Sequence, residues 1–213
     1  MLIVKTILFD FDGTIADTLS VMVEIANEVL EEMGRQPLTP KQIEHYRGMT
    51  VMQIKDELKI PATKIPSLVA KARKKLFGYR DELCPIPKVL EVIKLLGKEG
   101  VTVGMLTSNS KRNVDYFLSR HNADKLFDFV YTGSSLFGKT RMIKKIIRKY
   151  GLDASGMIYV GDEVRDITTA KKAHVAVASV TWGFNSEMIL RQYEPDVVIT
   201  KPEQLLNLAK AKY

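Results

Sequence analysis

Two aspartates, Asp10 and Asp12, stand directly after an apolar run at residues 3–9. The run is mostly β-branched and aromatic and closes at an Asp-Gly turn signal, which is typical of a buried strand that stops abruptly. Residues two apart lie on the same side of an extended segment, so both carboxylates face the same way. Because neighbouring carboxylates repel each other unless a proton or a cation lies between them, this spacing indicates a divalent metal site.

Further polar residues follow other strand-like runs. They are Thr107, Ser108 and Asn109, then Lys139 at the start of a helix pattern, then Asp162 and Asp166. Taken singly, such residues are more often turns, helix caps or first-turn carboxylates. The carboxyl ends of parallel strands, however, meet at one edge of a sheet, where ligands bind. Carboxylates, hydroxyl and amide donors and one lysine at that edge suit a phosphoryl group with magnesium better than an acyl or glycosyl substrate.

The elements that would position these residues alternate regularly from residue 88 onward. Helices are expected at residues 88–98, 111–121, 140–150, 164–173 and 202–211, and strands at residues 101–107, 127–131, 157–160, 175–178 and 196–200. Such alternation predicts an α/β fold, a doubly wound parallel Rossmann-like sheet with right-handed crossovers.

Between the first strand and this alternation, the sequence shows helix patterns only. Helices are expected at residues 17–34, 39–45, 50–58 and 67–79, with prolines 37, 40, 61 and 66 at the breaks. The block is far longer than a simple crossover needs, so we predict a small all-helical cap domain at residues 16–83 and a core made of residues 1–15 and 84–213. Residues 16–17 and 83–87 are the expected hinges.

Composition narrows the classes of function. The 213 residues carry a net charge of +7 and one cysteine, Cys84, which excludes an intrachain disulfide and a multi-cysteine zinc site. No nucleic-acid motif accompanies the charge, so we interpret it as solvated lysine faces, including the basic run at residues 71–75, and expect no nucleic-acid binding. The apolar run at the N-terminus is too short for a membrane span and contains Lys5, so we expect a cytoplasmic protein.

The chain resembles the haloacid dehalogenase superfamily in four motifs that occur in order. They are Asp10-x-Asp12-Gly13-Thr14, Thr107-Ser108, Lys139, and Gly161-Asp162-x-x-x-Asp166. The helical insertion after the first motif and the segment Val180-Thr181-Trp182-Gly183-Phe184 resemble the phosphoglycolate-phosphatase-like branch, and the resemblance covers nearly the whole chain. It implies a Mg²⁺-dependent phosphatase that acts on a small phosphorylated metabolite, such as phosphoglycolate or a sugar phosphate, as a monomer or weak homodimer.

The resemblance also implies roles for the charged residues. Asp10 would be the nucleophile that forms an aspartyl-phosphate, and Asp12 would be the general acid and then the general base. The metal would be held by Asp10, by the backbone carbonyl of Asp12 and by Asp162, with Asp166 ordering the water shell of the metal or Lys139. Lys139 would neutralise charge on the nucleophile and the phosphate.

The remaining implied contacts are to the phosphate and to the rest of the substrate. Phosphoryl oxygens would be bound by Thr107 or Ser108 with Asn109 nearby, and the turn at Gly13 would bring backbone N–H groups to the phosphate. In the cap, Arg47 would pair with a carboxylate or second phosphate of the substrate, or else be an exposed surface arginine. Glu163 is either a carboxylate behind the metal site or a charge at a helix start.

Two alternative functions use some of the same residues. Residues 133–140, GSSLFGKT, satisfy the P-loop pattern between an expected strand and an expected helix, so a P-loop nucleotide-binding protein is one alternative. Lys139 would face phosphate in either case. Nucleotide binding by a P-loop would give no role to Asp10, to Asp12 or to the Thr-Ser-Asn turn. A phosphatase would use all of them, so we favour the phosphatase. A phosphosugar mutase of the same family is the second alternative, because the same residues would serve it.

Overall fold

The computed structural model describes residues 4–133 and 138–210, so four residues of the P-loop-like stretch, 134–137, lie outside the described residues. Within the described part of the chain, the main sheet has six strands in the order β5-β4-β1-β6-β7-β8, all parallel. They are β1 (Thr6–Phe9), β4 (Thr102–Leu106), β5 (Phe129–Tyr131), β6 (Met157–Gly161), β7 (Ala176–Val180) and β8 (Val197–Ile199). The α/β class predicted from the sequence is confirmed.

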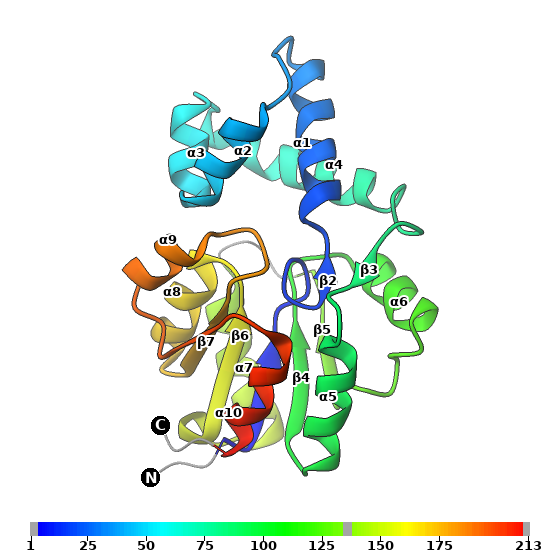
Figure 1. The fold of residues 1–213 in the computed structure, drawn as a ribbon, viewed down its shortest axis with the longest axis vertical. Helices are drawn as coiled ribbons and strands as arrows, with labels where there is room; N and C mark the ends of the chain where they lie inside the picture. Colours follow the sequence, from blue (N-terminus) through cyan, green and yellow to red (C-terminus); the bar gives the residue numbers. More distant parts are fainter. Residues whose placement is uncertain (1–3, 134–137, 211–213) are drawn as a thin grey trace.

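Strand β1 lies in the middle of the sheet, between β4 and β6, where the direction of strand succession reverses (Figure 1). In open α/β sheets this is the point at which ligands bind, at the carboxyl ends of the strands. The strand is buried on both faces, as a central parallel strand must be. Ile7 and Phe9 pack into one apolar cluster and Leu8 into the other, because successive side chains of a strand point to opposite faces.

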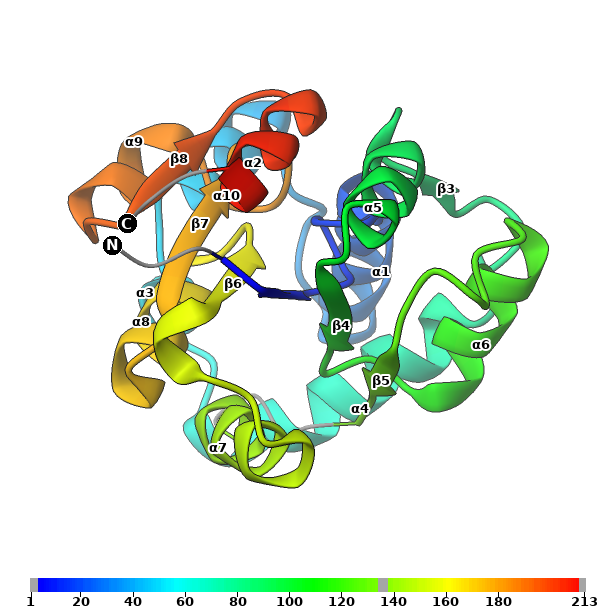
Figure 2. The same cartoon turned by 90° about the horizontal axis from the view of Figure 1, so that it is seen from below.

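Helices cover both faces of the sheet. Helices α5 (Val89–Lys98), α6 (Lys111–Arg120) and α10 (Leu206–Lys210) lie on one side, and α7 (Lys139–Tyr150) and α8 (Val164–Ala173) lie on the other (Figure 2). The short helices α9 (Glu187–Gln192), η2 (Ala154–Gly156) and η3 (Pro202–Leu205) complete the core. None of the helices within residues 4–133 and 138–210 is long and apolar enough to cross a membrane.

Four helices stand apart from the sheet, beyond the carboxyl ends of its strands (Figure 1). We call this group the cap; it consists of α1 (Leu19–Glu32), α2 (Pro40–Arg47), α3 (Val51–Glu57) and α4 (Ile65–Leu76), with the short helix η1 (Ala62–Lys64). Capping boxes at Thr39 with Gln42 and at Thr50 with Gln53 begin α2 and α3, which explains why both helices start after a threonine.

Two extended strands connect the cap with the sheet. β2 (Ala16–Asp17) and β3 (Cys84–Pro85) pair antiparallel, so the chain enters and leaves the cap side by side. Strand periodicity did not predict β2 or β3, because two residues are too few to show alternation.

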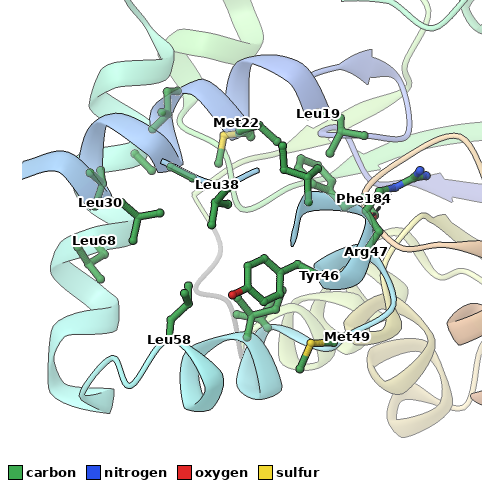
Figure 3. A pocket seen from close by; sticks show the side chains of 18 of the residues that line it. Leu19, Met22, Leu30, Leu38, Tyr46, Arg47, Met49, Leu58, Leu68 and Phe184 are labelled. Atoms are coloured by element: carbon green, nitrogen blue, oxygen red, sulfur yellow. Dashed lines mark hydrogen bonds between the residues drawn. The ribbon is translucent and has the colours of Figure 1, made fainter. Parts of the chain in front are cut away.

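The cap helices line an open apolar pocket of about 370 Å³, which lies between the pair α1 and α4 and the pair α2 and α3 (Figure 3). Side chains such as Met22, Leu38, Leu58 and Leu68 line it and are only partly buried. Arg47 and Phe184 lie at the end of the pocket that faces the core. The cap is therefore packed more loosely than the core below it.

Candidate active site

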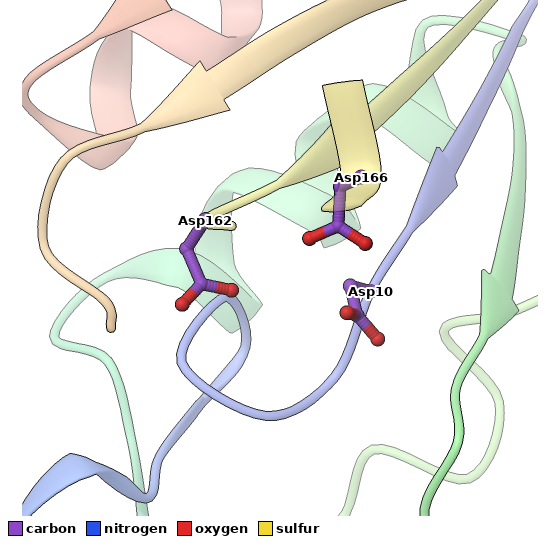
Figure 4. A group of neighbouring side chains, drawn as sticks. All are labelled: Asp10, Asp162 and Asp166. Atoms are coloured by element: carbon purple, nitrogen blue, oxygen red, sulfur yellow. The ribbon is translucent and has the colours of Figure 1, made fainter. Parts of the chain in front are cut away.

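Three buried carboxylates meet at the carboxyl edge of the sheet (Figure 4). Asp10 follows β1, Asp162 follows β6, and Asp166 lies in the first turn of α8. One oxygen from each lies within 4.8 Å of the others, and each residue is at most 1% exposed. The sequence placed these residues at one edge, and the structure brings them together.

Burial and mutual repulsion make it unfavourable for all three carboxyl groups to be ionised at the same time. Burial raises the pKa of Asp162 well above its usual value, and the neighbouring charges of Glu163 and Asp166 raise it further. Burial also raises the pKa of Asp10 to about 7, although Lys139 opposes the shift. Carboxylate oxygens are the ligands that hard divalent cations prefer, and a cation would remove the repulsion. The donor set therefore fits a divalent metal ion such as Mg²⁺.

Lys139, the first residue of α7, is buried against this group and is 1% exposed. Its Nζ donates to a carboxylate oxygen of Asp10, to Asp166 at 2.9 Å and to the hydroxyl of Tyr159 at 3.0 Å. Burial alone would lower the pKa of Lys139, but Asp10 and Asp166 hold it well above its usual value. The lysine is thus charged and partly compensates the aspartates. Tyr159 was not identified from the sequence, because it lies in an otherwise apolar strand.

A tight turn after β1 aims Asp10 at the site. Its Oδ1 accepts the backbone N–H of Phe11 at 2.8 Å. At Gly13, φ is +71°, and a Cβ there would lie 2.3 Å from a carboxylate oxygen of Asp162, so only glycine fits. The N–H of Gly13 donates to the carbonyl of Ala16 at 2.9 Å and to Thr18 Oγ1 at 3.1 Å. The close approach to Asp162 thus gives Gly13 a steric role, and the expected contact between this turn and the phosphate stays a prediction.

Asp162 is fixed in position by groups from two distant segments. The hydroxyl of Thr14 donates to its Oδ1 at 2.8 Å, and the N–H of Phe184 donates to its Oδ2 at 2.7 Å. Gly183 approaches so closely that a Cβ on it would lie 2.1 Å from Oδ2. The Thr14 and Gly183-Phe184 positions belonged to motifs that the sequence singled out, but their contact with Asp162 could not be read from spacing.

The side chain of Asp12 is hydrogen-bonded to Asn109. The amide of Asn109 donates to both carboxylate oxygens of Asp12, at 3.0 and 3.2 Å. Its Oδ1 accepts from the N–H of Ser110 at 2.7 Å and from Asn113 Nδ2 at 2.8 Å. Burial raises the pKa of Asp12 to about 6, with the bond from Asn109 opposing the shift. Asn109 therefore positions Asp12, and its expected phosphate contact stays a prediction.

Asp12 is consequently not one of the side-chain oxygens in the buried metal-ligand group found among residues 4–133 and 138–210. Only its backbone carbonyl was expected to contact the metal, and that expectation stays a prediction. A carboxyl with a pKa near 6 is suited to gaining and losing a proton close to neutral pH.

Thr107 and Ser108 lie buried at the end of β4, at the same edge. Thr107 Oγ1 accepts the backbone N–H of Asn109 at 2.9 Å, which shapes the turn. These positions are compatible with the phosphoryl contacts expected for them, which stay predictions.

Arg47 anchors the cap to the core. Its guanidinium donates to the carbonyls of Phe184 at 3.3 Å and Gly183 at 3.2 Å, and it pairs with Glu44 on its own helix. Asn185 completes the anchor, because its Nδ2 donates to the carbonyls of Arg47 at 3.1 Å and Met49 at 2.9 Å. The guanidinium is thus used between cap and core, and its expected contact with the substrate stays a prediction.

Glu163 pairs with the guanidinium of Arg165 and caps the N-terminus of α8. Its own N–H donates to Asp166 at 3.2 Å. It is not part of the metal-ligand group found in the described part of the chain. Glu163 is thus a capping residue that is paired with an arginine, and it follows Asp162 in sequence.

Known proteins are similar to this chain along nearly its whole length. A phosphoglycolate phosphatase of Synechococcus elongatus is 29% identical over 203 residues, which cover 95% of this chain and 96% of that protein. The pyrophosphatase PpaX of Bacillus cereus is 25% identical over 209 residues, which cover 96% of each protein. A haloacid dehalogenase-like family hydrolase of Streptococcus pneumoniae shares the fold, with a TM-score of 0.77 at 22% identity over 96% of this chain and 97% of that one.

The family itself is defined by a match over most of the chain. A sequence model described as haloacid dehalogenase-like hydrolase matches residues 7–180, which include all but the first residue of β1 and the whole of the three-carboxylate site. The match and the buried arrangement of Asp10, Lys139, Asp162 and Asp166 lead to the same conclusion. This chain belongs to the haloacid dehalogenase-like hydrolase family.

Proposed function

We propose that the protein is a magnesium-dependent phosphatase that hydrolyses a small phosphomonoester through an aspartyl-phosphate on Asp10. The observation that carries the proposal is the pairing of Asp10 with Lys139, beside two more buried carboxylates, at the switch point of the sheet. Relatives named phosphoglycolate phosphatase and pyrophosphatase, which align along nearly the whole chain, support phosphoryl chemistry.

Magnesium fits the donor set described above. Asp10 and Asp162 would hold it with side-chain oxygens, Asp12 with its backbone carbonyl, and Asp166 would support the site from behind. When bound, the ion would neutralise charge on the transferring phosphoryl group. The contacts of Thr14 and Phe184 with Asp162 would keep that carboxylate from turning away.

Asp10 is the group that we assign to attack on phosphorus. Its Oδ1 is held by the N–H of Phe11 and its Oδ2 by Lys139, so the carboxylate is fixed before the substrate arrives. Attack forms the bond between the aspartate oxygen and phosphorus and breaks the ester bond. Lys139 offsets the negative charge that gathers on the nucleophile and the phosphoryl oxygens, and Thr107 and Ser108 would donate to those oxygens.

Asp12 is the group that we assign to move protons. In its protonated form it would give a proton to the leaving alcohol oxygen, and the resulting carboxylate would then take a proton from the water that hydrolyses the aspartyl-phosphate. Its pKa of about 6 makes both forms accessible near neutral pH. Asn109 would keep the carboxyl in place through both steps, since its amide bonds both oxygens.

We propose that residues 16–83 form a separate cap domain. This domain would cover the edge of the sheet that carries the site. The paired strands β2 and β3 are where the chain passes in and out of the cap, and they are the proposed hinge. Closure would exclude water from the phosphoryl group, and reopening would release the products. The anchor between Arg47, Asn185 and the segment at Gly183 and Phe184 would fix the closed position.

The test is release of inorganic phosphate from a panel of small phosphate esters, with Mg²⁺ and with EDTA. We expect Mg²⁺-dependent release that falls by at least about a thousandfold in Asp10→Asn, because removal of a nucleophile eliminates the covalent route. Asp115→Asn, an exposed position on α6, is the matched control and should keep wild-type activity.

Three outcomes would count against the proposal. The first is the absence of metal-dependent release from every ester. The second is ATP binding and hydrolysis that Lys139→Ala abolishes and Asp10→Asn leaves intact, which would favour the P-loop alternative. The third is a sugar phosphate whose phosphoryl group moves between hydroxyl groups with no release of phosphate, which would favour the mutase.

A further inference from the structure

Tyr159 is a polar side chain in an otherwise apolar strand. It lies in β6, opposite Leu8 of β1, and it is completely buried. Both side chains belong to the apolar cluster on the side of the sheet that α7 and α8 cover. A phenol hydroxyl in such surroundings costs free energy unless it is hydrogen-bonded, so its partners indicate its role.

The hydroxyl of Tyr159 connects the lysine of the site with the end of another strand. It accepts an N–H of Lys139 Nζ at 3.0 Å and donates its own proton to the carbonyl of Leu106 at 3.4 Å, which is long for a hydroxyl donor. Leu106 is the last residue of β4, directly before the expected phosphoryl contacts. Burial and the nearby charge of Asp10 raise the pKa of Tyr159 well above its usual value of 10, so the hydroxyl stays neutral.

The ammonium of Lys139 has three N–H groups, and the chain supplies one acceptor for each. Two acceptors are carboxylate oxygens of Asp10 and Asp166, and the third is the hydroxyl of Tyr159. The ammonium therefore cannot turn without losing a hydrogen bond, and a buried N–H that loses its partner costs free energy. Tyr159 is the neutral member of the three, so its hydroxyl contributes direction and not charge.

The position of Lys139 in turn fixes the carboxylate of Asp10. Oδ1 of Asp10 accepts the N–H of Phe11, and Lys139 holds the other oxygen. A lysine displaced by a fraction of an ångström would let this carboxylate rotate out of line with the phosphorus. Small misplacements of a reacting group reduce the rate of a reaction strongly.

We infer that Tyr159 is a positioning residue, whose hydroxyl holds Lys139 against Asp10 and so keeps the nucleophile aligned. The inference rests on the proposed function and goes beyond it, because Tyr159 lies outside the four motifs that indicated the family. It also specifies how Lys139 acts. Because all three of its N–H groups have acceptors within the chain, Lys139 acts on the nucleophile by direct contact and on the phosphoryl group through its charge.

The test is Tyr159→Phe, which keeps the aromatic ring and removes only the hydroxyl. Tyr131→Phe is the matched control, because it removes the same group from a tyrosine of β5 that packs against the same apolar cluster. The substrate is the ester of the panel that wild-type protein hydrolyses fastest, at saturating Mg²⁺. The value of kcat is expressed per folded molecule, with the folded fraction measured by circular dichroism.

We expect kcat of Tyr159→Phe to fall by at least about tenfold while KM stays within about twofold of wild type, because the lost bond orients a group that acts in the transition state and the hydroxyl itself touches no substrate. Tyr131→Phe should match wild type in both constants. A merely structural role would reduce the folded fraction and leave kcat per folded molecule unchanged. That result, an equal fall of kcat in both variants, or a change in KM alone would overturn the inference.

A second measurement needs no substrate. NMR of protein with isotope-labelled lysine detects the Nζ protons of a buried ammonium, and the signal of Lys139 is the one that Lys139→Arg removes. These protons should exchange with water at least about tenfold faster in Tyr159→Phe than in wild type or Tyr131→Phe, because the ammonium has lost an acceptor. Unchanged exchange in Tyr159→Phe would overturn the inference. Failure of the proposed function is distinguishable, because it would appear as no metal-dependent phosphate release by wild-type protein from any ester of the panel.

Discussion

The two halves of the molecule that meet at the active site are built in opposite ways. On the core side, Asp10, Asp162, Asp166 and Lys139 are at most 1% exposed, and each has hydrogen bonds or ion pairs that fix its orientation. On the cap side, four helices line an open apolar pocket of about 370 Å³, and most of the side chains that line it are only partly buried.

This difference separates two requirements of catalysis on small phosphate esters. Charged groups that act on phosphorus must be in place before the substrate binds, so a rigid, fully hydrogen-bonded core suits them. A lid that opens and closes must instead deform at low energetic cost, and loose apolar packing permits that. Three measurements of the free energy of unfolding test this difference between core and cap.

The largest difference in the free energy of unfolding between a core variant and a cap variant should come from the removal of one lysine in each. At pH 8 and in EDTA, Lys139→Met should lower the free energy of unfolding by about 3–5 kcal/mol, because it leaves Asp10 and Asp166 buried without their cation. In the cap, Lys71→Met breaks an exposed ion pair with Glu32 and should cost less than about 1 kcal/mol. Urea unfolding followed by circular dichroism measures both.

The loss in Lys139→Met should also shrink at low pH, because Asp10 can then be protonated and no longer repels Asp166. Equal losses in the two variants, or a loss in Lys139→Met that does not depend on pH, would show that the core charges are not held as the structure indicates.

The second difference concerns how the free energy of unfolding depends on pH. Burial raises the pKa of Asp12 to about 6 and that of Asp10 to about 7, above the usual 3.8, so the folded protein keeps protons that the unfolded chain has lost. Between pH 4 and these values, the free energy of unfolding of metal-free protein should therefore fall as pH rises, by at most about 1.4 kcal/mol per pH unit for each group. Asp12→Asn should make the fall between pH 4 and 6 shallower.

A carboxyl of the cap provides the contrast for this measurement. Hydrogen bonds from Lys75 and Tyr79 lower the pKa of Glu28 below its usual value of 4.5. Its contribution to stability is complete above pH 4.5 and is lost as pH falls through its folded pKa, so Glu28→Gln should leave the slope between pH 5 and 7 unchanged. A fall in Asp12→Asn that is as steep as in wild type, or steeper, would contradict the raised pKa of Asp12.

The sequence predicted the core side better than the cap side, for a physical reason. The three carboxylates follow predicted strands or begin a predicted helix; they are Asp10, Asp162 and Asp166. A parallel sheet brings such positions to one edge, whatever the order of its strands. Chain connectivity and strand periodicity were therefore enough to predict the α/β class and to group the three carboxylates.

Contacts across the boundary between cap and core were not predictable in the same way. For Arg47 the sequence left a substrate contact and an exposed position open, and it did not predict the bonds of this side chain to the carbonyls of Gly183 and Phe184. Arg73 was interpreted as part of a solvated face, but its backbone is held by Asn113 from the core. Both depend on how one group of helices docks on the sheet, and a periodic pattern within one helix contains no information about that docking.

The smallest difference in the free energy of unfolding should come from a larger side chain placed in the cap and in the core. Ala26 in α1 lines the cap pocket, whereas Ala170 in α8 is completely buried in the core. Ala26→Leu should change the free energy of unfolding by less than about 1 kcal/mol, and raise it if anything, because the added carbons fill space that already exists. Ala170→Leu should lower it by about 1–3 kcal/mol, because a close-packed core must shift to accept the larger side chain.

The two substitutions are matched in size, in type of secondary structure and in helix propensity, since alanine and leucine are both strong helix formers. What differs is only the space around the residue, so urea unfolding of the two variants measures that space directly. If Ala26→Leu costs as much as Ala170→Leu, the interior of the cap is as closely packed as the core. A cap of that kind could not deform at low cost, and closure would then have to take place at the paired strands β2 and β3 alone, with the cap moving as a rigid body.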